Sequence, residues 1–116
     1  MALPEFSQLC NEAKKEIEEI SADDLRILQK SGEDFALVDV REKEESAHGM
    51  IANAVSIPRG IVELSIDQVT TDKDKKIVLY CAGGNRSALA AWMLKKMGFR
   101  HVISLAGGYR GWMQSQ

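Results

Sequence analysis

The expected fold follows most directly from one stretch of the sequence, Ile77-Val78-Leu79-Tyr80-Cys81-Ala82-Gly83-Gly84-Asn85-Arg86-Ser87. It begins with an apolar run typical of a buried strand, and an amphipathic segment typical of a helix starts at Ser87. The turn between them contains Cys81 and two glycines. Glycine tolerates positive φ and lets the backbone approach a bound group closely, so the amides of this turn can face inward. The sequence therefore predicts a thiol at the end of a strand, inside a loop of amides that opens a helix.

Strand and helix patterns alternate on both sides of this stretch. We expect strands at residues 17–20, 35–38, 54–57, 77–80 and 102–103. Helices are expected at residues 3–15, from a capping box at 21–24 to a stop at Gly32, at 42–48, around 61–64, from Ser87 to Gly98 with Leu89, Met93 and Met97 on one face, and as a short turn at 107–112. Strands separated by helices imply an α/β fold with a parallel sheet covered on both faces.

The position of the functional site follows from this pattern. Asp39 and Cys81 each come directly after an apolar strand run. In an open parallel sheet, ligands collect at the carboxyl ends of the strands. We therefore expect both residues at the same edge of the sheet, and we expect the chemistry there.

Length, charge and cysteine usage narrow the class of protein. The chain has 116 residues and a net charge of -2, which indicates one domain and gives no case for nucleic-acid binding. It has no apolar run of membrane-spanning length and no signal-peptide pattern at its start, so we expect no membrane partner and a cytoplasmic location. Cys10 and Cys81 form no disulfide framework and suit no metal site, so no metal or organic cofactor is indicated.

Three motifs together carry a family resemblance. They are Leu37-Val38-Asp39-Val40-Arg41-Glu42, Cys81-Ala82-Gly83-Gly84-Asn85-Arg86-Ser87 and Leu105-Ala106-Gly107-Gly108-Tyr109-Arg110-Gly111-Trp112. In this order they resemble the rhodanese family of sulfurtransferases. The resemblance implies a five-stranded parallel sheet flanked by helices on both faces. It divides the chain into an N-terminal helical extension at residues 1–16 and a rhodanese-like domain at 17–116.

The resemblance also implies a reaction. Cys81 would accept sulfane sulfur from thiosulfate or another persulfide donor, and would pass it as a persulfide to cyanide or a protein thiol. A thiolate is the competent nucleophile, and inward amides can stabilise its charge and that of the persulfide. The expected substrate-binding residues are Ala82, Gly83, Gly84, Asn85, Arg86, Ser87 and Arg59.

These binding residues are expected to act in different ways. Arg86 would add positive charge for an anionic donor and, to a larger extent, pin the loop by pairing with a carboxylate. Asn85 would accept an unusual backbone angle, and Ser87 would cap the helix. By the resemblance, Arg59 lies near the rim of the site, where it could contact an anion.

Other residues are expected to support the site or the core. Asp39 would hold backbone amides or an arginine at its strand end, and Arg41 would pair with a neighbouring carboxylate. The acidic residues at 42–45 would form a solvated helix face. Cys10, on the expected N-terminal helix, would be a small core thiol.

The chain departs from the family pattern at residues 49–54. Many rhodaneses have Gly-His-Ile-Pro-Gly-Ala there, whereas this chain has Gly49-Met50-Ile51-Ala52-Asn53-Ala54. The changes concern packing and turn geometry rather than the thiol. The cysteine loop also holds only one basic residue, so a protein or a small persulfide is an alternative to thiosulfate as donor.

Two other function classes stay open. A cysteine phosphatase or arsenate reductase uses a similar loop, but its usual pattern places five residues between Cys and Arg, whereas four separate Cys81 from Arg86. A non-catalytic rhodanese-like module that binds a partner protein is the second alternative. The residues leave the oligomeric state and the physiological donor and acceptor open.

Overall fold

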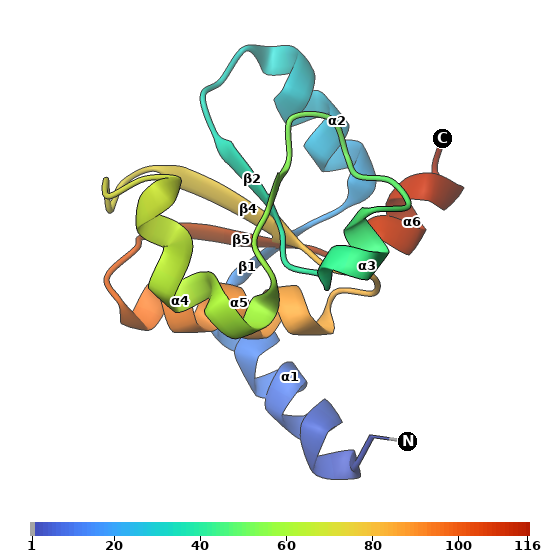
Figure 1. Ribbon diagram of the computed structural model, residues 1–116, viewed down its shortest axis with the longest axis vertical. Helices are drawn as coiled ribbons and strands as arrows, with labels where there is room; N and C mark the ends of the chain where they lie inside the picture. Colours follow the sequence, from blue (N-terminus) through green and yellow to red (C-terminus); the bar gives the residue numbers. More distant parts are fainter. Residues whose placement is uncertain (1) are drawn as a thin grey trace.

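A computed structural model describes residues 2–116, and its centre is one parallel five-stranded sheet (Figure 1). The strands are β1 (Glu18–Ile20), β2 (Ala36–Asp39), β3 (Val55–Ser56), β4 (Lys76–Tyr80) and β5 (His101–Leu105). They lie in the order β1-β5-β4-β2-β3, and every neighbouring pair is parallel. The predicted α/β class and five-stranded parallel sheet are confirmed.

Helices cover both faces of the sheet. They are α1 (Pro4–Glu16), α2 (Ala22–Ser31), α3 (Lys43–Ser46), α4 (Val62–Ser65), α5 (Asn85–Lys96) and α6 (Gly108–Gln114), with two 3-10 turns, η1 (Arg59–Ile61) and η2 (Ile66–Gln68). In Figure 1, α4 and α5 lie on one side of the sheet, and α2 and α6 lie on the other. No helix within residues 2–116 is long and apolar enough to span a bilayer.

β4 connects the two halves of the core. Its side chains alternate, so Ile77 and Leu79 join the cluster under α5, while Val78 and Tyr80 join the cluster on the opposite face. All four are fully buried, and burial of an aliphatic side chain of this size contributes roughly 1.5–3 kcal/mol. This central strand is therefore a rigid base for the residue that follows it, Cys81.

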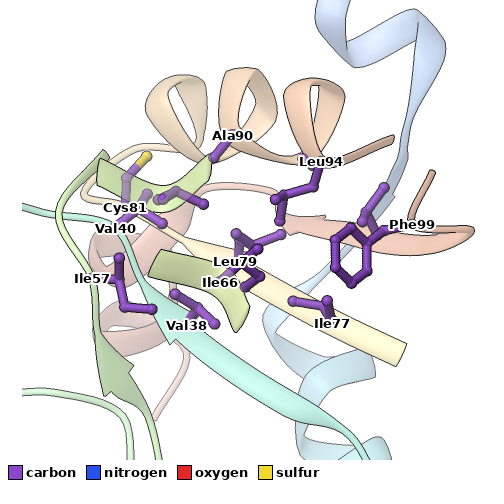
Figure 2. Close-up of a cluster of buried hydrophobic side chains, with 13 residues drawn as sticks. Val38, Val40, Ile57, Ile66, Ile77, Leu79, Cys81, Ala90, Leu94 and Phe99 are labelled. Carbon is purple, nitrogen blue, oxygen red and sulfur yellow. The ribbon is translucent and has the colours of Figure 1, made fainter. Parts of the chain in front are cut away.

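α5 packs closely on the sheet because its buried face is made of small residues. Ala88, Ala91 and Leu94 are fully buried, and Figure 2 shows Leu94 over the strand residues of the same cluster. The face predicted from Leu89, Met93 and Met97 is not the core face, since Met97 is 42% exposed. α1 lies against α5 instead of the sheet, so the N-terminal helix adds a further layer on this side.

Local signals in the sequence account for several helix ends and turns. Ser21 and Asp24 form the predicted capping box of α2, and Gly32 ends that helix with φ 77°. Asn53 has φ 71°, the only positive φ of a non-glycine residue within residues 2–116. It stands where the family pattern has glycine, and asparagine is among the residues that tolerate this region best.

Candidate active site

Cys81 follows β4 at the carboxyl edge of the sheet, and its sulfur is surrounded by hydrogen-bond donors. Sγ accepts the backbone N–H of Gly84 at 3.1 Å and that of Ser87 at 3.4 Å. The Ser87 hydroxyl lies 3.4 Å from the same sulfur. Figure 2 shows Cys81 at the end of the core cluster, beside Val40. The loop thus forms a cradle of donors around one sulfur atom.

The structure corrects the expected roles of Ser87 and Asn85. Gly84 is the N-cap of α5 with φ 107°, so Asn85 is the first helical residue and has no unusual backbone angle. Ser87 is the third residue of the helix, and its hydroxyl bonds to sulfur and to Ser104 Oγ at 2.8 Å instead of capping the helix. The cause is that Gly84 takes the left-handed turn, which brings the first turn of the helix to the sulfur.

The donors around Cys81 determine the protonation state of its thiol. Burial by itself raises the pKa of Cys81, but the hydrogen bonds from Ser87, Gly84 and Gly83 outweigh burial and bring it below the ordinary value of 9.0. Hydrogen bonds to the charged form of a group favour that form. The donors therefore favour the thiolate form of Cys81 more than in a free cysteine.

Arg86 is held by a carboxylate at the mouth of the loop. Its Nη1 and Nη2 donate to Glu45 Oε1 at 2.7 Å and to Oε2 at 3.0 Å. The hydrogen bond from Arg86 is the main reason why the pKa of Glu45 falls to about 2. The pairing agrees with the larger of the two roles expected for Arg86. It also shows that Glu45 does not belong to a purely solvated helix face.

Asp39 and Arg41 form a buried pair at the end of β2, as the sequence predicted. Arg41 Nη2 donates to Asp39 Oδ2 at 2.6 Å, and the Arg41 backbone N–H donates to Oδ1 at 2.9 Å. Ser46 Oγ donates to the same carboxylate at 2.9 Å, and Arg41 also reaches the carbonyl of Gly49 at 2.6 Å. Burial raises the pKa of Asp39, but these bonds outweigh it and lower the pKa overall. The pair fixes the strand end and the segment after α3.

An open hollow of about 440 Å³ lies over the sulfur. It is lined by Phe6, Cys81, Ala82, Gly83, Asn85, Arg86 and Arg110. Four of the expected binding residues line it, while Gly84 and Ser87 contact the sulfur from within the loop. Arg59 is not among the lining residues, and its Nη1 donates to Glu63 at 2.8 Å. Arg59 thus has a carboxylate partner, Glu63, and its contact with a donor anion stays a prediction.

Two lining residues come from elements that the sequence reasoning left out of the site. Phe6 is on α1, and Arg110 is on α6. The start of α6 is joined to the cysteine loop, because Tyr109 N–H donates to the Cys81 carbonyl at 2.8 Å and Arg110 N–H donates to the Ala82 carbonyl at 3.1 Å. The signal that could have revealed Arg110 is its place in the third family motif.

Gly108 permits this junction between α6 and the loop. A Cβ atom at Gly108 would lie 2.6 Å from the carbonyl carbon and oxygen of Ala82 and from the carbonyl oxygen of Cys81. Its φ is 57°, in the region that favours glycine. Gly108 is thus a shape-determining residue of the site.

Cys10, the second cysteine, has the expected core position. It is 1% exposed on α1, and burial raises the pKa of its thiol. Neither cysteine is in a disulfide.

Comparison with known proteins finds one family across most of the chain. The family described as the rhodanese-like domain matches residues 21–115. A sulfurtransferase of Allochromatium vinosum is 33% identical over 96 residues, which cover 83% of this chain and 88% of that protein. The human single-domain sulfurtransferase TSTD1 superposes with a TM-score of 0.76 at 27% identity, over 84% of this chain and 96% of the human one.

One similar structure also includes the N-terminal helix. It is a protein of unknown function from Rhodopseudomonas palustris CGA009, described as a possible tyrosine phosphatase. It has a TM-score of 0.86 and 35% identity, and the match covers 99% of this chain and 94% of that chain.

Proposed function

Because the chain belongs to the rhodanese-like domain family, we propose that it is a sulfurtransferase that carries sulfane sulfur on Cys81. The observation that carries this proposal is the set of donors on Cys81 Sγ, from the Gly84 and Ser87 amides and the Ser87 hydroxyl. These donors lower the pKa of the thiol despite its burial. They support a nucleophile that works without a separate general base.

In the first step, the Cys81 thiolate attacks the outer sulfur of thiosulfate or of another persulfide donor. The Sγ–S bond forms as the donor's bond to that sulfur breaks, and the leaving group departs with the electron pair, as sulfite in the case of thiosulfate. The negative charge moves from Sγ to the terminal sulfur of the persulfide. Preorganised donors in the cradle stabilise this charge.

In the second step, a nucleophile such as cyanide or a protein thiolate attacks the terminal sulfur. The new bond to sulfur forms as the Sγ–S bond breaks, and Cys81 recovers its thiolate. With cyanide the product is thiocyanate. The free state of both cysteines favours a reducing compartment such as the cytoplasm for this cycle.

Intact-protein mass tests this function directly. The purified, reduced chain is treated with thiosulfate and then with cyanide, beside Cys81→Ser and Cys10→Ala. We expect the wild type and Cys10→Ala to gain one sulfur atom and to lose it to cyanide with release of thiocyanate. Absence of the gain with thiosulfate, and also with a protein or glutathione persulfide, would contradict the proposal and favour a binding module.

A phosphatase is the second candidate, and the description of the Rhodopseudomonas protein favours it. In a phosphatase mechanism, Arg86 of the cysteine loop would have to direct its cation at the phosphate, but both of its terminal nitrogens are engaged by Glu45. The four-residue spacing between Cys81 and Arg86 also makes a small ring around one sulfur atom. Hydrolysis of p-nitrophenyl phosphate that disappears in Cys81→Ser would establish the phosphatase, and absence of hydrolysis would dismiss it.

A further inference from the structure

Two arginines line the hollow over Cys81, and their guanidinium groups differ in how far they are engaged by other side chains. Arg86 donates two hydrogen bonds to Glu45. Arg110 takes part in none of the ion pairs formed within residues 2–116. The guanidinium of Arg110 therefore has its charge and its donors available at the hollow, whereas those of Arg86 are largely used.

The position of Arg110 is fixed relative to the cysteine loop. Its backbone N–H donates to the Ala82 carbonyl at 3.1 Å. Its Nη2 lies 3.3 Å, and its Cζ 3.6 Å, from the point that a Cβ at Gly83 would occupy. The guanidinium thus lies against the face of the loop at Gly83. The absence of a side chain at Gly83 leaves the space that this contact needs.

We propose that Arg110 binds the oxyanion group of the sulfur donor while Cys81 receives the sulfur. This inference rests on the sulfurtransferase function proposed above. The donor class is a sulfonate or sulfinate-type group bonded to sulfane sulfur, as in thiosulfate or an organic thiosulfonate. A planar guanidinium can donate to two oxygens of such a group at once. The same group leaves with the electron pair as sulfite or sulfinate when the Sγ–S bond forms.

The rest of the hollow fits a donor with a localised charge. Phe6 contributes an apolar side chain from α1, and Ala82 and Gly83 contribute no charge. Arg110 is then the cation that replaces the second basic residue missing from the cysteine loop. This arrangement explains how a loop with one basic residue, already paired, could still accept an anionic donor.

The test compares Arg110→Gln with Arg110→Lys and with Arg100→Gln. Arg100→Gln is the control because it removes the same charge from an exposed arginine that does not line the hollow. Arg100 pairs with Asp74, and its side chain is 61% exposed. We expect Arg110→Gln to raise KM for thiosulfate about tenfold, as loss of a hydrogen bond to a charged group predicts, with kcat changed less than about twofold. Arg110→Lys should recover most of this loss, and kcat/KM of Arg110→Gln should depend less on salt. Equal KM and equal salt dependence for Arg110→Gln and Arg100→Gln would overturn the inference.

Binding to variants without the nucleophile separates this inference from the proposed function. Thiosulfate is titrated into Cys81→Ser and into Cys81→Ser/Arg110→Gln, and amide chemical shifts of the loop are followed by NMR. Saturable shifts in Cys81→Ser that disappear on addition of Arg110→Gln support the anion site. If these shifts are seen but the wild type does not transfer sulfur, only the sulfurtransferase function is overturned. If the wild type turns over and the double variant binds thiosulfate as tightly as Cys81→Ser does, only the role of Arg110 is overturned. Repetition with methanethiosulfonate shows whether an organic donor uses the same arginine.

Discussion

The two cysteines of this chain have the same burial but opposite chemistry. Cys10 and Cys81 are each 1% exposed. Burial raises the pKa of Cys10, whereas the pKa of Cys81 is lowered because donors from Gly84 and Ser87 outweigh the same effect. Hydrogen bonds to the sulfur, and not its accessibility, therefore set the direction in which the pKa of each thiol shifts.

Removal of each sulfur in turn gives the largest expected contrast. Cys81→Ser should reduce sulfur transfer to the level without protein, because a serine hydroxyl ionises far outside the working pH range. Cys10→Ala should leave transfer within about twofold and cost roughly 1–2 kcal/mol of stability, as a small core truncation does. Thiocyanate production and urea unfolding measure the two effects. Transfer retained by Cys81→Ser would refute the assignment of the nucleophile.

A substitution that leaves both cysteines in place can still change the shape of the cradle. Gly108→Ala should destabilise the fold by about 2–4 kcal/mol and strongly reduce transfer, because its Cβ would lie 2.6 Å from backbone atoms of Cys81 and Ala82. Gly32→Ala is the matched control, since Gly32 also has a positive φ, of 77°, but no atom lies within 4 Å of the added Cβ. We expect about 1 kcal/mol for the control and no loss of transfer. Equal effects at the two glycines, measured by urea unfolding and thiocyanate release, would show that α6 does not shape the site.

Removal of a single hydrogen-bond donor should bring the pKa of Cys81 closer to that of Cys10. Ser87→Ala should raise the pKa of Cys81, because the Ser87 hydroxyl is the largest of the interactions that lower it. The folded-state pKa is depressed, so reactivity of the wild type persists below pH 9.0 and is lost as the pH falls through the lowered value. We expect the rate of the variant at neutral pH to fall about tenfold and to approach that of the wild type at alkaline pH.

Ser56→Ala is the control for this experiment. Ser56 Oγ is buried and has no hydrogen-bond partner within the described residues, so its removal should leave the pH profile unchanged. The quantity compared is the pH dependence of persulfide formation. An unchanged profile for Ser87→Ala would mean that the amides alone govern the thiol.

The smallest effect is expected at the pair that holds Arg86. Glu45→Gln should cost no more than about 1 kcal/mol, since the two side chains are 31% and 37% exposed and solvent screens them. The pKa of Glu45 is depressed to about 2, so the pair stabilises the fold above the ordinary value of 4.5 and is lost as the pH falls towards 2. The difference in unfolding free energy between wild type and variant should therefore be full at pH 7 and should shrink as the pH falls from 4.5 towards 2. Glu63→Gln, which removes the partner of Arg59, is the control away from the cradle.

The sequence predicted the fold better than the details of the site. Apolar runs such as residues 77–80 and the Ser21 capping box act locally, so their pattern is visible in the chain itself. The pairing of Arg86 with Glu45 joins residues 41 positions apart, and no local pattern shows it. The role of Ser87 was missed because the helix begins earlier than expected, at the residue after Gly84.

The lining residues from α1 and α6 illustrate the same limit. Phe6 and Arg110 are distant in sequence and meet at the hollow only after α1 has packed on α5 and α6 has bonded to the cysteine loop. Tertiary contacts of this kind follow from how elements pack, which spacing along one element does not determine. Motif order nevertheless predicts chemistry at Cys81, and the structure places hydrogen-bond donors around that sulfur.

The most direct test of the account follows both sulfur atoms in one sample. The chain is prepared with isotopically labelled cysteine, and the Cβ shifts of Cys10 and Cys81 are titrated with pH by NMR, with Cys10→Ala and Cys81→Ser for assignment. The account predicts that Cys81 ionises below pH 9.0 and Cys10 above it. Ionisation of the two thiols at the same pH, or of Cys10 first, would contradict it.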